Sequence, residues 1–189
     1  ECELDHENPW QLLVATILAA QNTDRNINKV TPGLFRRWPN PAALGAAERA
    51  DVEAAVKSTG FFRNKARAIQ EASRIIAAEH DGEVPRSMAA LCRLPGVARK
   101  TANVVLGVAC GLSSGIAVDT HVSRVSKRLG LTAEKDPNKI EADLCAQIAR
   151  RSWVITGHRL ILHGRYVCLA RTPHCSECPL NELCDAREQ

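Results

Sequence analysis

Four cysteines crowd into the last part of the chain and constrain its fold more than any other feature. Cys168, Cys175, Cys178 and Cys184 follow the pattern C-x6-C-x2-C-x5-C. Thiolates at such spacings can close around one metal centre, and both zinc and a [4Fe–4S] cluster accept four cysteines. Structural zinc sites usually use two tightly spaced pairs, whereas only one pair is tight here. The spacing therefore favours a cluster over zinc, and zinc over free thiols.

The other cysteines and the composition indicate a reduced globular protein. Cys2, Cys92, Cys110 and Cys145 stand singly, which is typical of small apolar residues and not of a disulfide framework. The 189 residues are 45% hydrophobic and 24% charged, enough for one large domain or two small ones. A net charge of +4 permits a polyanionic partner without requiring one.

The apolar runs are too short for a membrane segment. The longest, "LLVATILAA" over residues 12–20, falls well below the roughly 20 residues that span a bilayer. The chain does not open with a charged-then-apolar signal segment. We therefore expect an intracellular protein with no membrane association.

Helix start signals recur along the chain and predict an all-α fold of nine or ten helices. Alternating apolar patterns long enough for a strand are missing from the sequence, and aromatic residues are only 4%. We expect Pro32 and Gly33 to kink or split the helix over residues 23–38. Ser87 caps a short helix. Capping residues followed by a first-turn proline occur at Asn8-Pro9, Asn40-Pro41 and Asp136-Pro137.

The stretch "LPGVARKTANVV" over residues 94–105 joins a proline-glycine turn to an apolar helix. With the short helix before it, this stretch predicts a helix-hairpin-helix element whose second helix starts near Val97. Free N–H groups at such a helix start bind a phosphate oxygen without reading base sequence. The structural alternative is a tight helix–helix turn with no binding role.

Lys100 lies near the start of this helix, where the dipole disfavours a positive charge. Its place is at the edge of the apolar stripe, which at 100° per residue contains Val97, Thr101, Val104, Val105 and Val108. Partial burial and the dipole both favour a neutral amine, which is a nucleophile that forms a Schiff base at a sugar carbon. The alternative is a snorkelling lysine with a solvated head group.

Two further features lie after the hairpin. Asp119, in "AVDTHVSRV", is an expected N-cap of the next helix, and a carboxylate there can also assist proton transfer. Arg124, Lys127 and Arg128 stand at i, i+3 and i+4 and form a basic face. Such a face either binds phosphate or is merely solvated.

Over nearly its whole length the chain resembles the endonuclease III family of DNA glycosylases. The resemblance rests on "HGRYVC" with the four spaced cysteines, and on "LPGVARK", "VDTH", "AQNTD" and "STGFFRNKA". It implies a helix-hairpin-helix glycosylase fold with the DNA cleft between two domains. The six-helix barrel would cover residues 5–112, with the hairpin over about 87–107, and the iron–sulfur domain would cover residues 113–189 plus the extreme N-terminus.

The resemblance also implies an activity and a site. The family excises oxidised pyrimidines from duplex DNA and nicks the abasic site by β-elimination. By resemblance, Lys100 is the nucleophile, Asp119 is its catalytic partner, and Gln21 and Phe61 fill the gap left by the flipped base. A [4Fe–4S] cluster is expected on the four cysteines 168, 175, 178 and 184. The expected DNA contacts are Gln21, Phe61, Leu94, Gly96, Ala98, Lys100, His121, Arg124 and Arg171.

Two alternatives and several departures accompany this interpretation. A monofunctional adenine or mismatch glycosylase of the same superfamily would lack the lysine nucleophile, and a non-catalytic DNA-binding module would not need Lys100 and Asp119 together.

Ala98 replaces a usual hairpin glycine, and we expect helical φ/ψ there. Pro32, Thr172 and His174 also depart from the family pattern. We expect a monomer in a bacterial-type cytoplasm, with a eukaryotic nucleus or mitochondrion left open.

Overall fold

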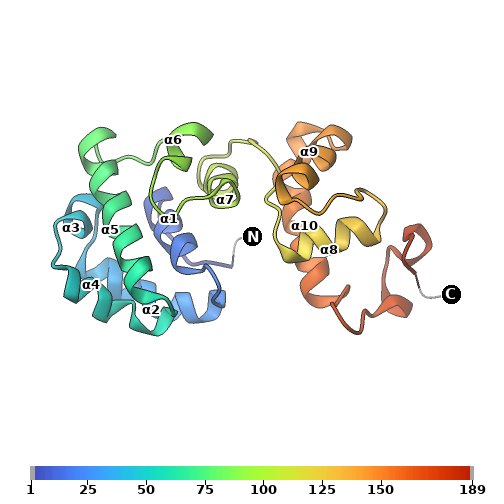
Figure 1. Cartoon of the computed structure of the whole chain (residues 1–189), viewed down its shortest axis with the longest axis horizontal. Coiled ribbons are helices and arrows are strands. Elements are labelled where there is room, and N and C mark those ends of the chain that lie inside the picture. Colours follow the sequence, from blue (N-terminus) through green and yellow to red (C-terminus); the bar gives the residue numbers. More distant parts are fainter. Residues whose placement is uncertain (1–2, 188–189) are drawn as a thin grey trace. The chain divides into compact units, whose positions relative to one another are not determined.

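The computed structural model describes residues 3–187, and the helices in that range form two compact units that meet after Leu112. Cys2 lies outside the described residues. Figure 1 shows the helices in chain order, and the described part of the chain contains no strand. The first unit holds α1 (Pro9–Leu18), α2 (Asp24–Arg37), α3 (Pro41–Gly45), α4 (Arg49–Ala55), the 3-10 turn η1 (Lys57–Thr59), α5 (Phe62–Glu79), α6 (Met88–Cys92) and α7 (Arg99–Ala109).

The second unit begins at Ser113 and is smaller. Its helices are α8 (Thr120–Arg128), α9 (Pro137–Gln147) and α10 (Trp153–Tyr166), with 3-10 turns η2 (Arg150–Ser152), η3 (Cys175–Glu177) and η4 (Asn181–Leu183). Among the residues described, ten α-helices are therefore present, as the helix signals predicted. The first unit ends at Leu112, where the resemblance places the end of the barrel domain, and two of its seven α-helices are only five residues long. The barrel itself stays a prediction.

The predicted caps explain where the helices begin. Asn8 accepts a hydrogen bond from the Gln11 N–H at 2.9 Å, and Asn40 accepts one from Ala43 at 2.8 Å. Each cap precedes a proline at the first helical position, where the missing N–H costs nothing. The side chains of Ser87 and Asp136 likewise accept hydrogen bonds from first-turn N–H groups of α6 and α9. These four predicted caps are confirmed.

Pro32 does not split α2, so of the predicted kink or split the split is wrong. The helix continues from Asp24 to Arg37 with Pro32 inside it. Pro32 is exposed, whereas the opposite face of the helix, with Ile27, Thr31 and Leu34, is buried. A proline on the solvent side loses one backbone hydrogen bond where water can replace it, and the buried face holds the helix together.

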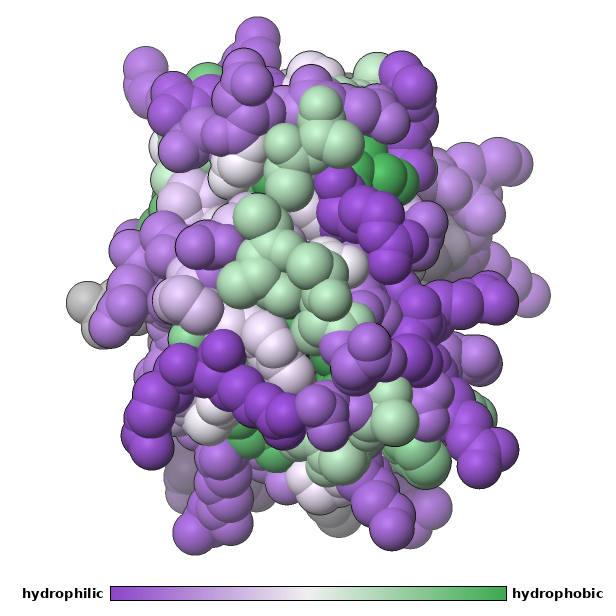
Figure 2. Space-filling view, turned by 90° about the vertical axis from the view of Figure 1, so that its left-hand side faces the viewer, coloured by the Kyte–Doolittle hydropathy of each residue, from purple (hydrophilic) through white to green (hydrophobic). Residues whose placement is uncertain are grey.

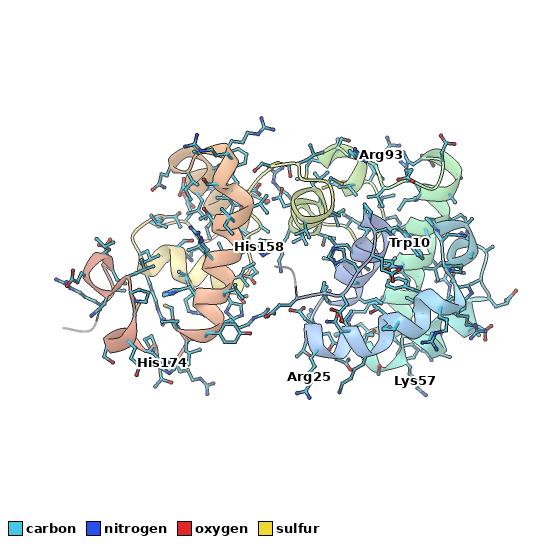
Figure 3. All side chains as sticks on the ribbon, turned by 180° about the vertical axis from the view of Figure 1, so that it is seen from behind. Trp10, Arg25, Lys57, Arg93, His158 and His174 are labelled. Atoms are coloured by element: carbon cyan, nitrogen blue, oxygen red, sulfur yellow. The ribbon has the colours of Figure 1, made fainter. Side chains whose placement is uncertain are left out.

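The core of the first unit surrounds α1, whose residues Leu12, Leu13 and Leu18 are fully buried. The Trp10 indole N–H donates to the Ser73 hydroxyl at 3.0 Å, so the one polar atom of that buried ring is satisfied. Figure 3 shows Trp10 inside this unit. Leu4 also belongs to this core, so the segment that starts at Glu3 packs with the first unit, whereas the sequence analysis assigned the extreme N-terminus to the second domain.

On α3 and α4, small apolar side chains lie among hydrophilic ones at the surface of the first unit. Ala42, Ala46, Ala50 and Ala54 recur every four residues and are exposed. Figure 2, which looks at this side of the unit, shows mostly hydrophilic side chains around weakly hydrophobic strips. In the described part of the chain, every helix falls short of the length and hydropathy that crossing a membrane requires.

Two glycines in the first unit give opposite stability predictions. A Cβ on Gly45 would lie 3.0 Å from the Arg74 Cα, because α3 packs closely on α5. A Cβ on Gly33, in α2, would meet nothing within 4 Å. We expect Gly33→Ala to raise the free energy of unfolding by about 0.5–1 kcal/mol and Gly45→Ala to lower it by about 1–3 kcal/mol. Urea unfolding of both variants checks this, and a stabilised Gly45→Ala would contradict it.

Candidate active site and metal centre

The predicted hairpin is present, and its turn is held by packing and one backbone bond. The Val97 N–H donates to the Leu94 carbonyl at 3.1 Å, and both side chains are buried. Gly96 has φ 78°, and a Cβ there would lie 2.9 Å from the Ala68 Cβ and 3.2 Å from Ile17. Only glycine fits this close approach of the turn to α1 and α5.

The second hairpin helix starts later than predicted. α7 begins at Arg99, and Ala98 is its N-cap with φ −87° and ψ 169°, so the expectation of helical φ/ψ at Ala98 is wrong. Burial of Val97 explains the shift, because its side chain is turned into the core and the chain must stay extended through Ala98. The negative φ carries no strain for alanine. A methyl group cannot cap a helix, and Ala98 makes no side-chain bond to the first turn of α7.

Lys100 is exposed, which corrects the predicted partial burial. The buried residues of α7 are Ala102, Asn103, Val105 and Leu106. Of the predicted stripe, Val97 and Val105 are buried, whereas the other three residues are only half-buried. At 100° per residue, Lys100 falls on the side of the helix opposite the centre of the buried residues. The lysine amine therefore reaches solvent freely from the first turn of α7.

Asp24 is the charged neighbour of Lys100 within the first unit. Burial raises the pKa of the Asp24 carboxyl, and the Lys100 ammonium opposes this by lowering it. The sequence analysis noted Asp24 only as part of "AQNTD". Its position as the first residue of α2, where helices favour acidic side chains, was the available signal.

Asp119 is the N-cap of α8, as predicted. Its Oδ1 accepts a hydrogen bond from the Val122 N–H at 2.8 Å. One carboxylate oxygen is thus engaged by the helix. Because a carboxylate has a second oxygen with its own lone pairs, Asp119 can cap α8 and still accept a proton or face a cation.

Gln21 and Phe61 share an uncommon backbone conformation. Their φ values are 54° and 46°, and the other non-glycine residue with positive φ among residues 3–187 is Asp81. Left-handed backbone costs a residue with a Cβ roughly 1–2 kcal/mol. Phe61 is 69% exposed, the large apolar side chain that the sequence predicted to enter the duplex. Gln21 is exposed as well.

Arg124 and Arg128 bond to backbone carbonyls of the cysteine segment. Arg124 donates to the Gly164 carbonyl at 2.7 Å and to the Cys168 carbonyl at 3.1 Å. Arg128 donates to the Leu169 carbonyl at 2.7 Å. Two of the three cations read as a basic face therefore tie α8 to the loop that follows α10. The sequence analysis missed this role, and a DNA contact of Arg124 stays a prediction.

The remaining predicted DNA contacts differ in what they offer. Leu94 is buried, so it can present only its backbone. His121 is half-buried, and its Nδ1 lies 3.2 Å from the Arg124 guanidinium. Arg171 is exposed beside the cysteines. Figure 3 shows further cations, Arg25 and Lys57, extending outward from the first unit.

The four clustered cysteines line one cavity of about 190 Å³ in the second unit. Arg128 Nη1 lies 3.2 Å from the Cys168 Sγ, and the Leu180 N–H lies 3.4 Å from the Cys178 Sγ. Such N–H donors stabilise thiolate sulfur. Across residues 3–187 the histidine, cysteine and carboxylate side chains form no group of three or more that could hold a single metal ion. The donor set and the cavity fit a four-cysteine iron–sulfur cluster.

Two protein-family models match the chain. The model described as "HhH-GPD superfamily base excision DNA repair protein" matches residues 14–150, which include the hairpin. The model described as "Iron-sulfur binding domain of endonuclease III" matches residues 168–184, which begin and end on clustered cysteines. The second match identifies the cysteine segment as an iron–sulfur domain.

The chain is also similar to known proteins over almost its entire length. It is 54% identical to Endonuclease III of Synechocystis sp. over 99% of this chain and 85% of that protein. It is similar to the solved structure of a non-covalent Endonuclease III-DNA complex, with a TM-score of 0.92 and 46% identity over 98% of this chain and 87% of that one. A trapped covalent Endonuclease III-DNA intermediate matches with a TM-score of 0.93, the same identity and the same coverage.

The hairpin turn gives a prediction that separates its two small residues. Gly96→Ala should lower the melting temperature clearly, because positive φ and the 2.9 Å approach to Ala68 both oppose a Cβ. Ala98→Gly should not raise it, because φ at Ala98 is already −87°. Calorimetry of the two variants checks both statements. A marked stabilisation by Ala98→Gly would contradict the extended, unstrained geometry.

The cysteine cavity predicts the colour and metal content of the protein. We expect purified protein to be yellow-brown with about four irons per chain. Cys178→Ser should reduce the iron content, whereas the matched variant Cys92→Ser, at an exposed cysteine in α6, should leave it unchanged. Optical absorption and metal analysis measure this, and a colourless protein with one zinc would contradict it.

Proposed function

Because this chain belongs to the endonuclease III family within the HhH-GPD superfamily of base excision DNA repair proteins, we propose that it removes oxidised pyrimidines from duplex DNA through a Schiff base on Lys100. The chain is a DNA glycosylase with abasic-site lyase activity, and it carries a [4Fe–4S] cluster. The substrate class and the residue roles below are our proposal.

The exposed amine of Lys100 on the first turn of α7 carries this proposal. The Lys100 Nζ attacks C1′ of the damaged nucleotide, and the N-glycosidic bond breaks with its electron pair going to the base. Nζ then loses a proton, and the C1′–O4′ bond breaks with its electron pair going to O4′, which takes up a proton. The opened sugar is thereby joined to the lysine by a protonated imine between Nζ and C1′. Removal of a C2′ proton then expels the 3′ phosphate, which is the β-elimination that nicks the strand.

The backbone around Lys100 supplies the grip on DNA. The first-turn N–H groups of α7, which a methyl side chain at Ala98 cannot cap, face a phosphate oxygen in this proposal. Gly96 lets the backbone approach closely, and Leu94 offers only main-chain atoms. His121, Arg124 and Arg171 are proposed as further contacts, with exposed Arg171 the best placed for a phosphate.

Asp119 acts on the same deoxyribose as Lys100 in this proposal. Its second carboxylate oxygen stabilises the positive charge that develops on the sugar as the base leaves, and assists proton transfer. The cap bond to Val122 fixes the orientation of that oxygen. An exposed lysine nucleophile is unnecessary for a monofunctional adenine or mismatch glycosylase, so Lys100 supports the bifunctional reaction.

Gln21 and Phe61 fill the space that the extruded nucleotide leaves. A damaged base inside the stack is out of reach of Lys100 and must be flipped out. A polar wedge can bond to the orphaned partner base, and an apolar wedge can stack beside it.

We further propose that the protein acts as a monomer on DNA in a bacterial-type cytoplasm, with the cluster on Cys168, Cys175, Cys178 and Cys184 in a structural role.

Lys100→Ala should abolish covalent trapping by borohydride, because no other side chain forms the imine in this proposal. Binding to a duplex with a stable abasic analogue should change by less than about threefold, since the backbone of the hairpin is intact. Gel analysis of the trapped complex and fluorescence anisotropy measure the two effects. The proposed role of Lys100 is wrong if the variant still traps.

Asp119→Asn separates the chemistry from the helix cap. Asparagine caps helices as well as aspartate does, so the melting temperature should stay nearly unchanged. Loss of the carboxylate charge should slow base release by roughly 100-fold or more. Asp119→Ala should lose the cap as well. Equal losses of stability and of base-release rate in Asp119→Asn would favour a purely structural role.

A further inference from the structure

One backbone carbonyl of the first unit accepts hydrogen bonds from two distant side chains. The Asn22 Nδ2 lies 2.7 Å from the Thr59 carbonyl oxygen, and the Lys65 Nζ lies 2.6 Å from the same oxygen. Thr59 is buried and fixed in place, because its hydroxyl and its N–H both donate to the Val56 carbonyl. Thr59 therefore presents its carbonyl oxygen to both donors from a fixed position.

The two donors come from the two turns with left-handed backbone. Asn22 directly follows Gln21 in the connection between α1 and α2. Lys65 lies in the first turn of α5, and its N–H donates to the Phe61 carbonyl at 3.1 Å. The Thr59 carbonyl thus joins the Gln21 turn to the Phe61 turn.

A second link runs parallel to the first. The Asn26 Nδ2 lies 3.1 Å from the Ser58 carbonyl and 3.2 Å from the Asn22 Oδ1. The same Asn22 oxygen accepts from the Thr23 N–H at 2.8 Å. Both ends of the Asn22 side-chain amide are therefore engaged, so its orientation is fixed.

Lys65 is placed for this contact and not for DNA. Its side chain is only 6% exposed, so the ammonium cannot reach a phosphate of bound DNA. Burial lowers the pKa of the ammonium from its ordinary value. A buried lysine is costly unless it is hydrogen-bonded, and the Thr59 carbonyl supplies that bond.

We propose that Asn22 and Lys65 are positioning residues for base extrusion, because they clamp the Thr59 carbonyl and so hold Gln21 and Phe61 in the left-handed conformation that presents both side chains together. Residues in a strained backbone conformation persist only where contacts with the surrounding structure hold them there. The clamp is the contact that the two turns share. The inference rests on the proposed role of Gln21 and Phe61.

Asn22→Asp tests the clamp by replacing the Asn22 donor with a carboxylate oxygen, which repels the Thr59 carbonyl oxygen. Aspartate keeps the oxygen that accepts from Thr23 and Asn26 but cannot donate to the Thr59 carbonyl. Lys65→Met fills a similar volume and leaves no buried charge, so it provides a second, independent variant. Asn138→Ala, at an exposed position of α9 in the second unit, is the matched control.

The measurement is single-turnover base release from two duplexes. In one, thymine glycol is paired with adenine; in the other it faces cytosine, so that less pairing opposes extrusion. We expect Asn22→Asp and Lys65→Met to slow release from the paired duplex by about tenfold, the effect of one hydrogen bond. The loss on the mismatched duplex should be less than about threefold. Equal losses on both duplexes, or no loss on either, would overturn the clamp.

Gln21→Ala and Phe61→Ala, measured in parallel, keep the two proposals apart. If these two wedge variants lose more base-release rate on the paired duplex than on the mismatched one while Asn22→Asp and Lys65→Met lose equally on both, the clamp is wrong and the wedge assignment stands. If neither wedge variant discriminates, the proposed role of Gln21 and Phe61 fails, and with it the function assigned to the clamp. Melting temperatures of all variants, compared with that of Asn138→Ala, show whether an effect is merely loss of folding.

Discussion

The close approach of Gly96 to α1 and α5 is the contact on which the arrangement of the candidate site depends. With Ala68 and Ile17 against it, the turn after α6 has no room for a side chain and only one backbone conformation. This conformation turns Val97 into the core and starts α7 at Arg99. Lys100 is thereby exposed on the first turn, next to N–H groups that have no capping side chain. Shape complementarity in the core thus determines where the proposed nucleophile lies.

The exposure of Lys100 changes the physical account of its reactivity. Burial was expected to favour the neutral amine, but the structure puts α7's apolar face on the other side of the helix. What remains is a side chain in solvent on the first turn of α7, near the Asp24 carboxyl, whose pKa the Lys100 ammonium lowers. An accessible lysine can approach a sugar carbon without first breaking a packed environment.

Local signals in the sequence predicted local structure well. Caps at Asn8, Asn40, Ser87 and Asp136 depend on a side chain and its next few residues, so they can be read directly from the chain. The comparisons also confirm the family and the iron–sulfur domain expected from the motifs. Predictions that needed tertiary knowledge failed. The start of α7 depends on Ile17 and Ala68, and the fate of Pro32 depends on which side of α2 is buried.

Arginines and left-handed residues were the least predictable parts of the site. Three cations on one helical face look the same in sequence whether they meet solvent, phosphate or a carbonyl. Arg124 and Arg128 meet carbonyls because the cysteine loop folds back onto α8. The positive φ of Gln21 could not be foreseen either, since the clamp proposed to hold it includes the Thr59 carbonyl, which is distant in sequence and bonded by Asn22.

With the wedge role proposed for Gln21 and Phe61, their preformed turns bear on how such an enzyme searches a genome. Nearly every base pair that a repair enzyme meets is undamaged, so each encounter must be brief. A probe that became ordered only on contact would lose conformational entropy at every site it inspected. Turns that are already shaped by the folded core lose that entropy once, when the protein folds, and the search can then proceed without repeated ordering.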